Sequence, residues 1–446
     1  MMELKVERYE EEEVKPVSPT PESLRTYKLC LTDQLSSTFY TPVVFFYAAS
    51  SPLHDYDRLK LSLSKALSLL YPLAGRQKDE FTVHCNDEGA QFIRANVTNA
   101  DLAHLLRHPK VHLLRKLFPR APYPTTFDPS QPILAVQVNR FLCGGTAVAI
   151  CLWHGLADAA ALVSLIRTWA GFNRGEAAAA THDSFAVDPT AIFPPIKFDV
   201  QAAMSSFAEM RRKARGNYIG KRHVFSKQEV ERIKDELVVS GRRPTRVEAM
   251  SAFVWAAVIR ANVLANPKLK MHILTNAVEL RGRLVPPLPP TCLGNINQLT
   301  AARWEAGAGV TALSLMGRVR ESIRRMDDGY VRRLHEGGGY LKAAEIIGER
   351  MGEGDGDEVR VLSMSSWFKF EFLEMDFGWG KPRWLGPGHS LGDLALLLDA
   401  EDGGIELWMG LPKAVAFHLH RDPAFASHVT FTQIVWEPPP LLPTRL

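Results

Sequence analysis

A change of hydrophobic period near residue 155 is the feature that most constrains how this chain can fold. Thr146 to Trp153 is a nearly continuous apolar run, which predicts a buried strand. Four apolar residues then recur at i, i+3, i+4 and i+7, the spacing of one helix face: Leu162, Leu165, Ile166 and Trp169. The chain therefore passes from a buried strand to a helix, and His154 lies at that transition.

Other segments show the same helix and strand patterns. Helices are predicted over 59–70, 247–258 and 312–326, and strands over 81–84, 133–141 and 271–277. The first structured piece that we predict after the acidic start, Met1 to Lys15, is a proline-punctuated loop over 16–21. Residues 352–357 read as an exposed loop, and the tail from Glu437 onward is expected to be frayed.

The length of 446 residues exceeds what one hydrophobic core usually supports, so two domains are expected. From Asn173 to about Asp199 the composition shifts to Gly, Ala, Asp and Pro, which indicates the start of a crossover. We place an N-terminal domain at 1–195, a linker at 196–220 and a C-terminal domain at 221–446. The net charge of +4 is too small to predict a nucleic-acid partner.

Cysteine usage and hydropathy favour a cytoplasmic protein. The five cysteines are odd in number and lack metal-ligand spacing, which is typical of reduced thiols that are mostly buried. The glutamate-rich start has no apolar region of the signal-peptide kind. No apolar stretch reaches about 18 residues, so we expect no membrane partner.

His154 and Asp158 form an HxxxD pattern at the strand-to-helix transition. Alone, the pattern also fits a histidine at a helix start that hydrogen-bonds the aspartate four residues on. A metal site is another interpretation, but no companion cluster of ligands is evident, and we predict none. The position favours a general base, because a desolvated imidazole stays neutral near pH 7.

A second motif, Asp376-Phe377-Gly378-Trp379-Gly380, lies far downstream. Its glycines alternate with large aromatic residues, which suggests a backbone packed closely against another element. A tight structural turn is the simplest interpretation.

The two motifs, in this order and separation, resemble those of the BAHD acyltransferases of plants. Further matching segments run along nearly the whole chain: residues 15–21, 33–35, 71–76, 143–145, 245–249 and 276–283. The N-terminal run and Ala159, which replaces a glycine after Asp158, are most similar to the vinorine synthase-like branch.

The resemblance implies an α/β fold of the chloramphenicol acetyltransferase type. Two similar-sized domains, each a mixed β-sheet with flanking helices, would enclose a solvent tunnel. Acyl-CoA would enter from one side and a small alcohol from the other, with His154 at the centre as the catalytic base. Acyl-CoA would be a co-substrate, with no permanently bound cofactor, and the protein would be a monomer.

The resemblance also assigns roles to other residues. Asp158 would be structural and would pair with Arg281 or Arg283. Asp376, Gly378 and Gly380 would be structural as well. A last group would line the coenzyme A side: Ser365, Ser366, Trp367 and Trp379. A Trp379 N–H, or a backbone amide near it, is a candidate donor to the tetrahedral oxyanion.

The function implied is acyl-CoA-dependent O-acyl transfer by general-base catalysis in a ternary complex. The predicted reaction moves acetyl from acetyl-CoA to a hydroxyl of a plant alkaloid, terpenoid or alcohol. Alternatives are an aromatic acyl-CoA donor, an amine acceptor, or a non-catalytic binding protein with the same fold.

Overall fold

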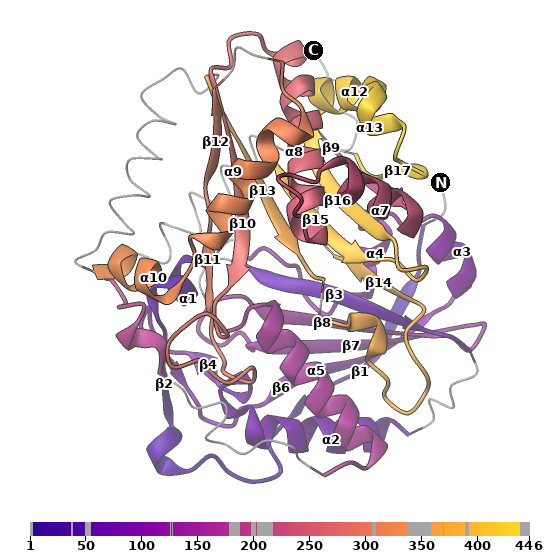
Figure 1. Cartoon of the computed structure of the whole chain (residues 1–446). Coiled ribbons are helices and arrows are strands. Elements are labelled where there is room, and N and C mark those ends of the chain that lie inside the picture. Colours follow the sequence, from indigo (N-terminus) through magenta and orange to yellow (C-terminus); the bar gives the residue numbers. More distant parts are fainter. Residues whose placement is uncertain are drawn as a thin grey trace, which may run out of the picture. The chain divides into compact units, whose positions relative to one another are not determined.

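The computed structural model describes residues 3–36, 39–49, 55–124, 126, 128–177, 188–197, 202, 217–305, 309–336, 358–368, 370–388 and 392–437. The loop predicted at 352–357 and the tail beyond Glu437 lie outside these residues, as does most of the linker predicted at 196–220. The elements of the chain are drawn in Figure 1.

The chain forms two compact units, and neither is continuous in sequence. Unit 1 comprises residues 1–209, 279–297 and 369–389, and unit 2 comprises 210–278, 298–368 and 390–446. The predicted boundaries gave each domain a single stretch of chain. The structure differs because two segments from the second half fold with unit 1, and one of them carries the motif at 376–380.

Unit 1 is built on a mixed sheet with the strand order β1-β6-β7-β8-β3-β14. Strands β6 and β7 are parallel, and the other neighbours are antiparallel. All residues of β8 are buried, as its apolar run predicts. The bounds are β1 Val6–Val14, β3 Tyr40–Tyr47, β6 Ala90–Val97, β7 Leu134–Phe141, β8 Thr146–Trp153 and β14 Trp384–Pro387.

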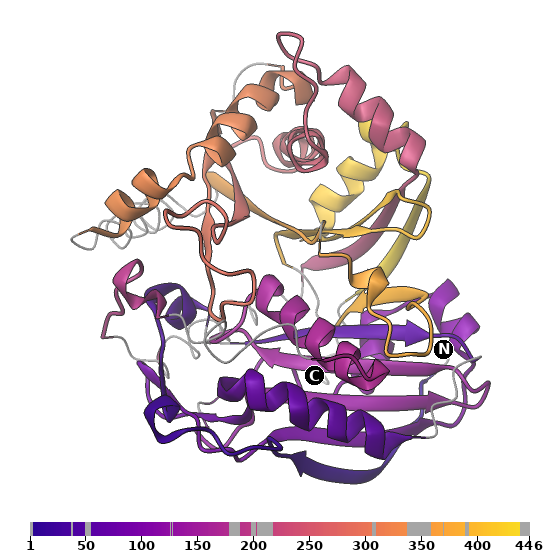
Figure 2. The same ribbon diagram turned by 60° about the horizontal axis from the view of Figure 1, so that its bottom comes forward.

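Helices α2 (Tyr56–Leu69) and α5 (Ala159–Arg174) lie on one face of this sheet (Figure 2). Helix α5 begins at its N-cap Asp158 and ends at Gly175, whose φ of +90° favours glycine. The smaller elements of unit 1 are α1 Leu31–Leu35, α3 Leu102–Arg107, α4 Val111–Leu114 and a sheet of β2 Thr26–Lys28, β4 Arg76–Gln77 and β5 Thr82–His84.

The acidic N-terminal segment corrects one prediction, because it forms the edge strand β1 rather than an irregular start. Its glutamates alternate between exposed and half-buried positions, and the half-buried ones pair with cations: Glu12 lies 2.9 Å from Lys60, and Glu10 lies 2.8 Å from Arg94. An exposed edge strand does not need a hydrophobic alternation, and its charges discourage edge-to-edge pairing. The hydrophobic pattern therefore could not reveal this strand.

Unit 2 contains a second mixed sheet with the order β11-β10-β13-β15-β16-β9-β17, in which β12 also pairs with β10. The strands are β9 Tyr218–Phe225, β10 Met271–Glu279, β11 Asn297–Leu299, β12 Ala302–Glu305, β13 Val359–Ser366, β15 Leu394–Asp399, β16 Ile405–Pro412 and β17 Phe431–Trp436. The helices are α7 Lys227–Glu236, α8 Arg246–Ala265, α9 Ala312–Arg324, α10 Asp328–His335, α12 Lys413–Arg421 and α13 Pro423–Ala426.

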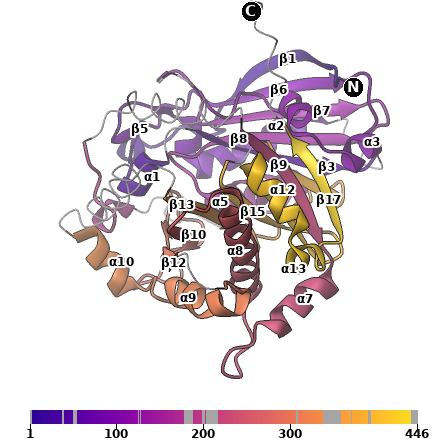
Figure 3. The same ribbon diagram turned by 90° about the horizontal axis from the view of Figure 1, so that it is seen from above.

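Helix α8 forms the centre of the unit 2 core, with α9 and α12 beside it in Figure 3. A capping box starts it, in which Thr245 and Glu248 satisfy each other's backbone N–H groups. Among the described helices, α8 is long and apolar enough to cross a membrane, but most of it is buried inside unit 2. Core packing accounts for its composition.

Because unit 2 contains three buried histidines, we expect the free energy of unfolding to fall in acid. Burial lowers the pKa of His223 to about 3 and those of His272 and His335 to about 4. In the unfolded chain these groups bind protons below about pH 6.5, so stability falls as pH drops from there. His223 alone should cost about 2 kcal/mol at pH 5.

Urea unfolding at pH 7.5 and pH 5.0 measures this effect. His223→Gln should reduce the difference in unfolding free energy between the two pH values by about 2 kcal/mol. Replacing the exposed His84 with Gln is the control and should leave the difference unchanged. An unchanged difference in His223→Gln would refute the prediction.

Candidate active site

His154 directly follows strand β8, and its backbone is anchored on both sides. Its N–H donates to the carbonyl of Phe39 at 2.9 Å, and its own carbonyl accepts from Asn295 Nδ2 at 2.6 Å. The Phe39 ring lies against the imidazole, with 4.7 Å between ring centroids. Gly155 permits the turn, because a Cβ there would lie 2.2 Å from the Trp153 ring.

Residues 292–296 run alongside the loop that joins His154 to α5. Gly294 N–H donates to Leu156 O at 3.0 Å, and Ile296 N–H donates to Asp158 Oδ2 at 3.1 Å. With the Asn295 contact, three consecutive residues bind the HxxxD loop. The loop is therefore positioned by a segment about 140 residues away in sequence.

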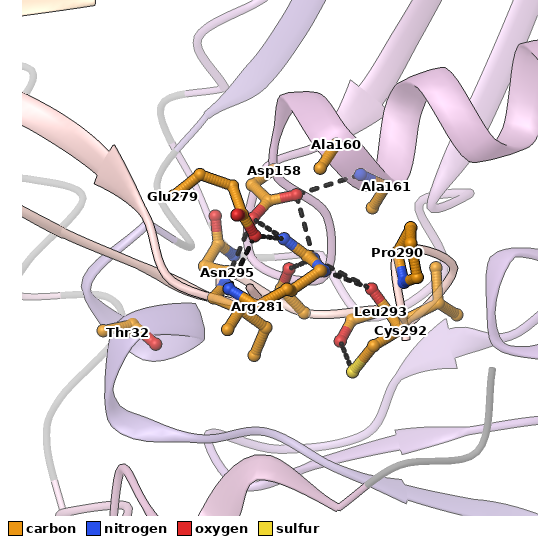
Figure 4. A network of polar contacts seen from close by, with 12 residues as sticks. Thr32, Asp158, Ala160, Ala161, Glu279, Arg281, Pro290, Cys292, Leu293 and Asn295 are labelled. Carbon is orange, nitrogen blue, oxygen red and sulfur yellow. Dashed lines mark hydrogen bonds and ion pairs between the residues drawn. The ribbon is translucent and has the colours of Figure 1, made fainter. Parts of the chain in front are cut away.

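Asp158 forms a buried bidentate ion pair with Arg281 (Figure 4). Nη1 lies 2.9 Å from Oδ2, Nη2 lies 3.1 Å from Oδ1, and the side chains are 3% and 8% exposed for Arg281 and Asp158. Asp158 Oδ1 also accepts from Ala161 N–H and thereby caps α5. Of the two predicted partners, Arg281 makes the pair, and Arg283 is exposed.

The guanidinium of Arg281 also forms hydrogen bonds to groups other than Asp158. It donates to the carbonyls of Cys292 and Gly294 and to Glu279 Oε1, the last at 3.1 Å. Burial by itself would lower the pKa of Arg281, but the charge and hydrogen bonds of Asp158, with the charge of Glu279, raise it. The arginine is therefore permanently charged and fixes the loop carrying His154.

The imidazole of His154 has the properties of a neutral base. It is partly buried, and burial lowers its pKa below the ordinary value. Its own carbonyl, the charge of Asp158 and the Asn295 side chain act in the opposite direction with smaller effects. Because the ring is uncharged near pH 7, it can accept a proton from a hydroxyl within hydrogen-bond reach.

Sequence reasoning did not single out Asn295 or Asp33 individually. Asn295 is fully buried, and its backbone N–H and Nδ2 both donate to Asp33 Oδ1, at 2.7 and 2.9 Å. Asp33 was noted only as part of residues 33–35, one of the segments that resemble the BAHD family. Polar residues within apolar surroundings were the available signal, but such residues are as often structural as functional.

The motif at 376–380 forms a tight turn around the Asp376 carboxylate. Oδ1 of Asp376 accepts from the backbone N–H groups of Gly378, Trp379 and Gly380 at 2.6, 2.9 and 2.9 Å. Gly378 and Gly380 have φ values of +94° and +88°, which side chains rarely adopt. The turn explains why the motif needs glycine at these two positions.

This turn is packed into unit 1. Phe377 is fully buried, its ring centroid is 4.8 Å from that of Trp169 on α5, and it stacks on Trp379. Asn173 Nδ2 donates to Phe377 O, and Tyr47 hydroxyl donates to Met375 O. The backbone amides of Gly378, Trp379 and Gly380 already donate to Asp376, and the identity of the oxyanion donor stays a prediction.

Replacing Asp376 with Ala should destabilise the protein by about 1–3 kcal/mol, because three backbone donors lose a charged acceptor. Thermal and urea unfolding measure the loss. The matched control is Glu374→Ala, which removes an exposed ion pair to Lys381 and should cost less than about 1 kcal/mol. Equal stability of the two variants would contradict a structural role for Asp376.

Ser365, Ser366 and Trp367 lie in unit 2, at the end of β13 and just beyond it. Both serines are partly exposed, and Trp367 is buried with its N–H donating to Leu397 O. Their role on the coenzyme A side stays a prediction, as does that of Trp379. Within the described residues, no group of three His, Cys, Asp or Glu side chains is arranged to hold a metal ion.

Comparisons with known proteins place this arrangement in a family. The family model described as the Transferase family matches residues 4–423. A limonoid 21-O-acetyltransferase of Melia azedarach is 33% identical over 421 residues, which cover 94% of this chain and 96% of the relative. A stemmadenine O-acetyltransferase of Catharanthus roseus is 31% identical and covers 90% of this chain and 93% of the relative.

A solved structure agrees with these relatives. The crystal structure of vinorine synthase matches with a TM-score of 0.80 and 29% identity, over 95% of this chain and 98% of that one. The predicted α/β fold of two mixed sheets with flanking helices is confirmed. The chain is an acyltransferase, and it belongs to the BAHD family.

Proposed function

We propose that this enzyme transfers an acetyl group from acetyl-CoA to a hydroxyl of a plant specialised metabolite, with His154 as the general base. The observation that carries the proposal is the neutral, partly buried imidazole of His154 on a loop fixed by Arg281 and Asn295. Acyl-CoA is the co-substrate of the family, and the relatives named above are O-acetyltransferases of a limonoid and an alkaloid.

The reaction needs one base and no covalent enzyme intermediate. The imidazole takes the hydroxyl proton while the hydroxyl oxygen attacks the thioester carbonyl carbon. The tetrahedral intermediate collapses, the carbon–sulfur bond breaks, and the coenzyme A thiolate takes the proton from the imidazolium. The products are an ester and free coenzyme A, and His154 returns to its neutral form.

A donor and acceptor screen with mass detection tests the proposal. Acetyl-CoA, malonyl-CoA, benzoyl-CoA and a hydroxycinnamoyl-CoA are each offered with a panel of terpenoid and alkaloid alcohols and amines. Acetyl esters of one class of alcohol, formed with equal release of thiol, are the expected result. A preference for an aromatic donor, or amide products, would contradict the proposed substrates; thiol release without an acylated product would contradict transfer.

A further inference from the structure

Asp33, on the short helix α1, is a buried carboxyl group that accepts hydrogen bonds from uncharged donors. It is 0% exposed. Oδ2 accepts from the backbone N–H and the thiol of Cys30 at 3.0 and 3.1 Å. Among the described residues, Asn295 alone donates to Oδ1, through its backbone N–H and its side-chain amide. Oδ1 of Asp33 therefore binds Asn295, the residue that also contacts the carbonyl of His154.

These contacts determine which way the Asn295 amide points. Nδ2 lies 2.9 Å from Asp33 Oδ1 and 2.6 Å from the carbonyl oxygen of His154. A flipped amide would place its oxygen against two acceptor oxygens, which is repulsive. The nitrogen must therefore occupy this position, and Oδ1 of Asn295 takes the other.

Two complementary atoms remain. Asn295 Oδ1 and His154 Nδ1 are both buried, and no other described residue satisfies either atom. The groups whose hydrogen bonds raise the pKa of the imidazole are the His154 carbonyl and the Asn295 side chain. An amide oxygen only accepts, whereas an imidazole nitrogen can carry a proton and donate. A proton on Nδ1 would satisfy both atoms and leave Nε2 as the free base.

We propose that Asp33 is a positioning residue that acts through Asn295 and holds His154 in the tautomer protonated at Nδ1. The inference rests on the proposed role of His154 as the base. Asp33 orients the Asn295 amide, the amide oxygen faces Nδ1, and Nε2 is thereby kept ready to accept the substrate proton. Without Asp33 the amide can turn, and the imidazole loses this constraint.

The surrounding titratable groups do not obscure a test by pH. Burial raises the pKa values of Tyr27, Cys30 and Cys292 near Asp33, that of Cys292 to about 11. Asp158, the charged group acting on His154, is bound by Arg281. Burial also raises the pKa of Asp33, against the hydrogen bonds from Asn295 and Cys30. A variant with an amide at this position separates the titration of Asp33 from that of His154.

The experiment compares Asp33→Ala with Asp33→Asn. The alanine variant should lower kcat about 10- to 100-fold and change both KM values less than about 3-fold. The acidic limb of its kcat/KM profile should move to lower pH, because the Asn295 side chain raises the pKa of His154. The asparagine variant keeps an oxygen for Asn295, so kcat should stay within about 3-fold and the limb should not move.

A matched control separates positioning from stability. Asp87 accepts hydrogen bonds from Thr20 and Arg25 in the same unit. Asp87→Ala should lower the melting temperature but leave the acidic limb in place. The double variant with Asn295→Ala should be no slower than Asn295→Ala alone, because the effect of Asp33 passes through Asn295. Additive losses, or an unmoved limb in Asp33→Ala, would overturn the proposal.

A measurement on the unaltered protein remains decisive if Asp33→Ala does not fold. Nitrogen NMR of ¹⁵N-histidine-labelled protein, assigned with His154→Gln, should report a protonated Nδ1 and a bare Nε2 at pH 7.5. The opposite tautomer would overturn the inference. If His154→Ala abolishes activity but Asp33→Ala does not alter it, only the inference fails; if His154→Ala stays active, the proposed function fails.

Discussion

Replacing His154 with Ala is expected to lower kcat about 10²–10⁴-fold while the protein stays folded. The neutral imidazole is the group proposed to take the hydroxyl proton, and alanine leaves no base in its place. The fold should survive because the backbone bonds of residue 154 to Phe39 and Asn295 do not need the side chain. Initial rates with saturating acetyl-CoA and acceptor, and the melting temperature, measure both expectations.

The control for this variant is another histidine of unit 1. His84, on β5, is exposed, and His84→Ala should keep kcat within about 2-fold. Turnover of His154→Ala close to that of His84→Ala would show that His154 is not the base. A collapse in melting temperature would instead show that its ring, packed on Phe39, is needed for folding.

Replacing Arg281 with Ala should destabilise the protein by about 3–5 kcal/mol. The substitution leaves the Asp158 carboxylate buried without its cation and removes donors from the carbonyls of Cys292 and Gly294. Activity should fall as well, since the HxxxD loop loses a main support. Urea unfolding gives the free energy, and rates are normalised to folded protein.

Arg283→Ala is the matched control, because it removes an exposed arginine two residues away. It should change stability by less than about 0.5 kcal/mol. Arg281→Lys should fall between the two, since lysine keeps the charge but lacks the planar fork that binds Asp158 through two nitrogens. If Arg281→Ala is as stable as Arg283→Ala but inactive, the ion pair acts on the chemistry and not on the structure.

Much of the fold was predictable because it depends on local periodicity. The apolar run at 146–153 and the helical spacing of Leu162 to Trp169 correspond to β8 and α5. The helices predicted at 59–70, 247–258 and 312–326 overlap α2, α8 and α9. The helices show apolar residues at helical spacing, and β8 is a continuous apolar run because both of its faces are buried, so neighbours in sequence suffice in each case.

The sequence-based predictions failed where the structure of a segment depends on a pairing partner far away in the sequence, or where the segment has no hydrophobic pattern. Strand β1 carries exposed glutamates, and it is a strand because β6 supplies its hydrogen bonds. The division into units depends on β14 pairing with β3, more than 300 residues earlier. Hydrophobic period carries no information about such pairings.

From the sequence alone we could identify the family, propose His154 as the general base, and interpret Asp158 and the motif at 376–380 as structural. Three contacts became known only from the folded structure. Arg281 binds Asp158, Asp376 accepts from the backbone amides of its own turn, and Asp33 binds Asn295, which in turn contacts His154. The first and third of these contacts join residues that lie far apart in the chain. Their geometry exists only after folding, because a hydrogen bond depends on distances of about 3 Å that residue spacing does not encode.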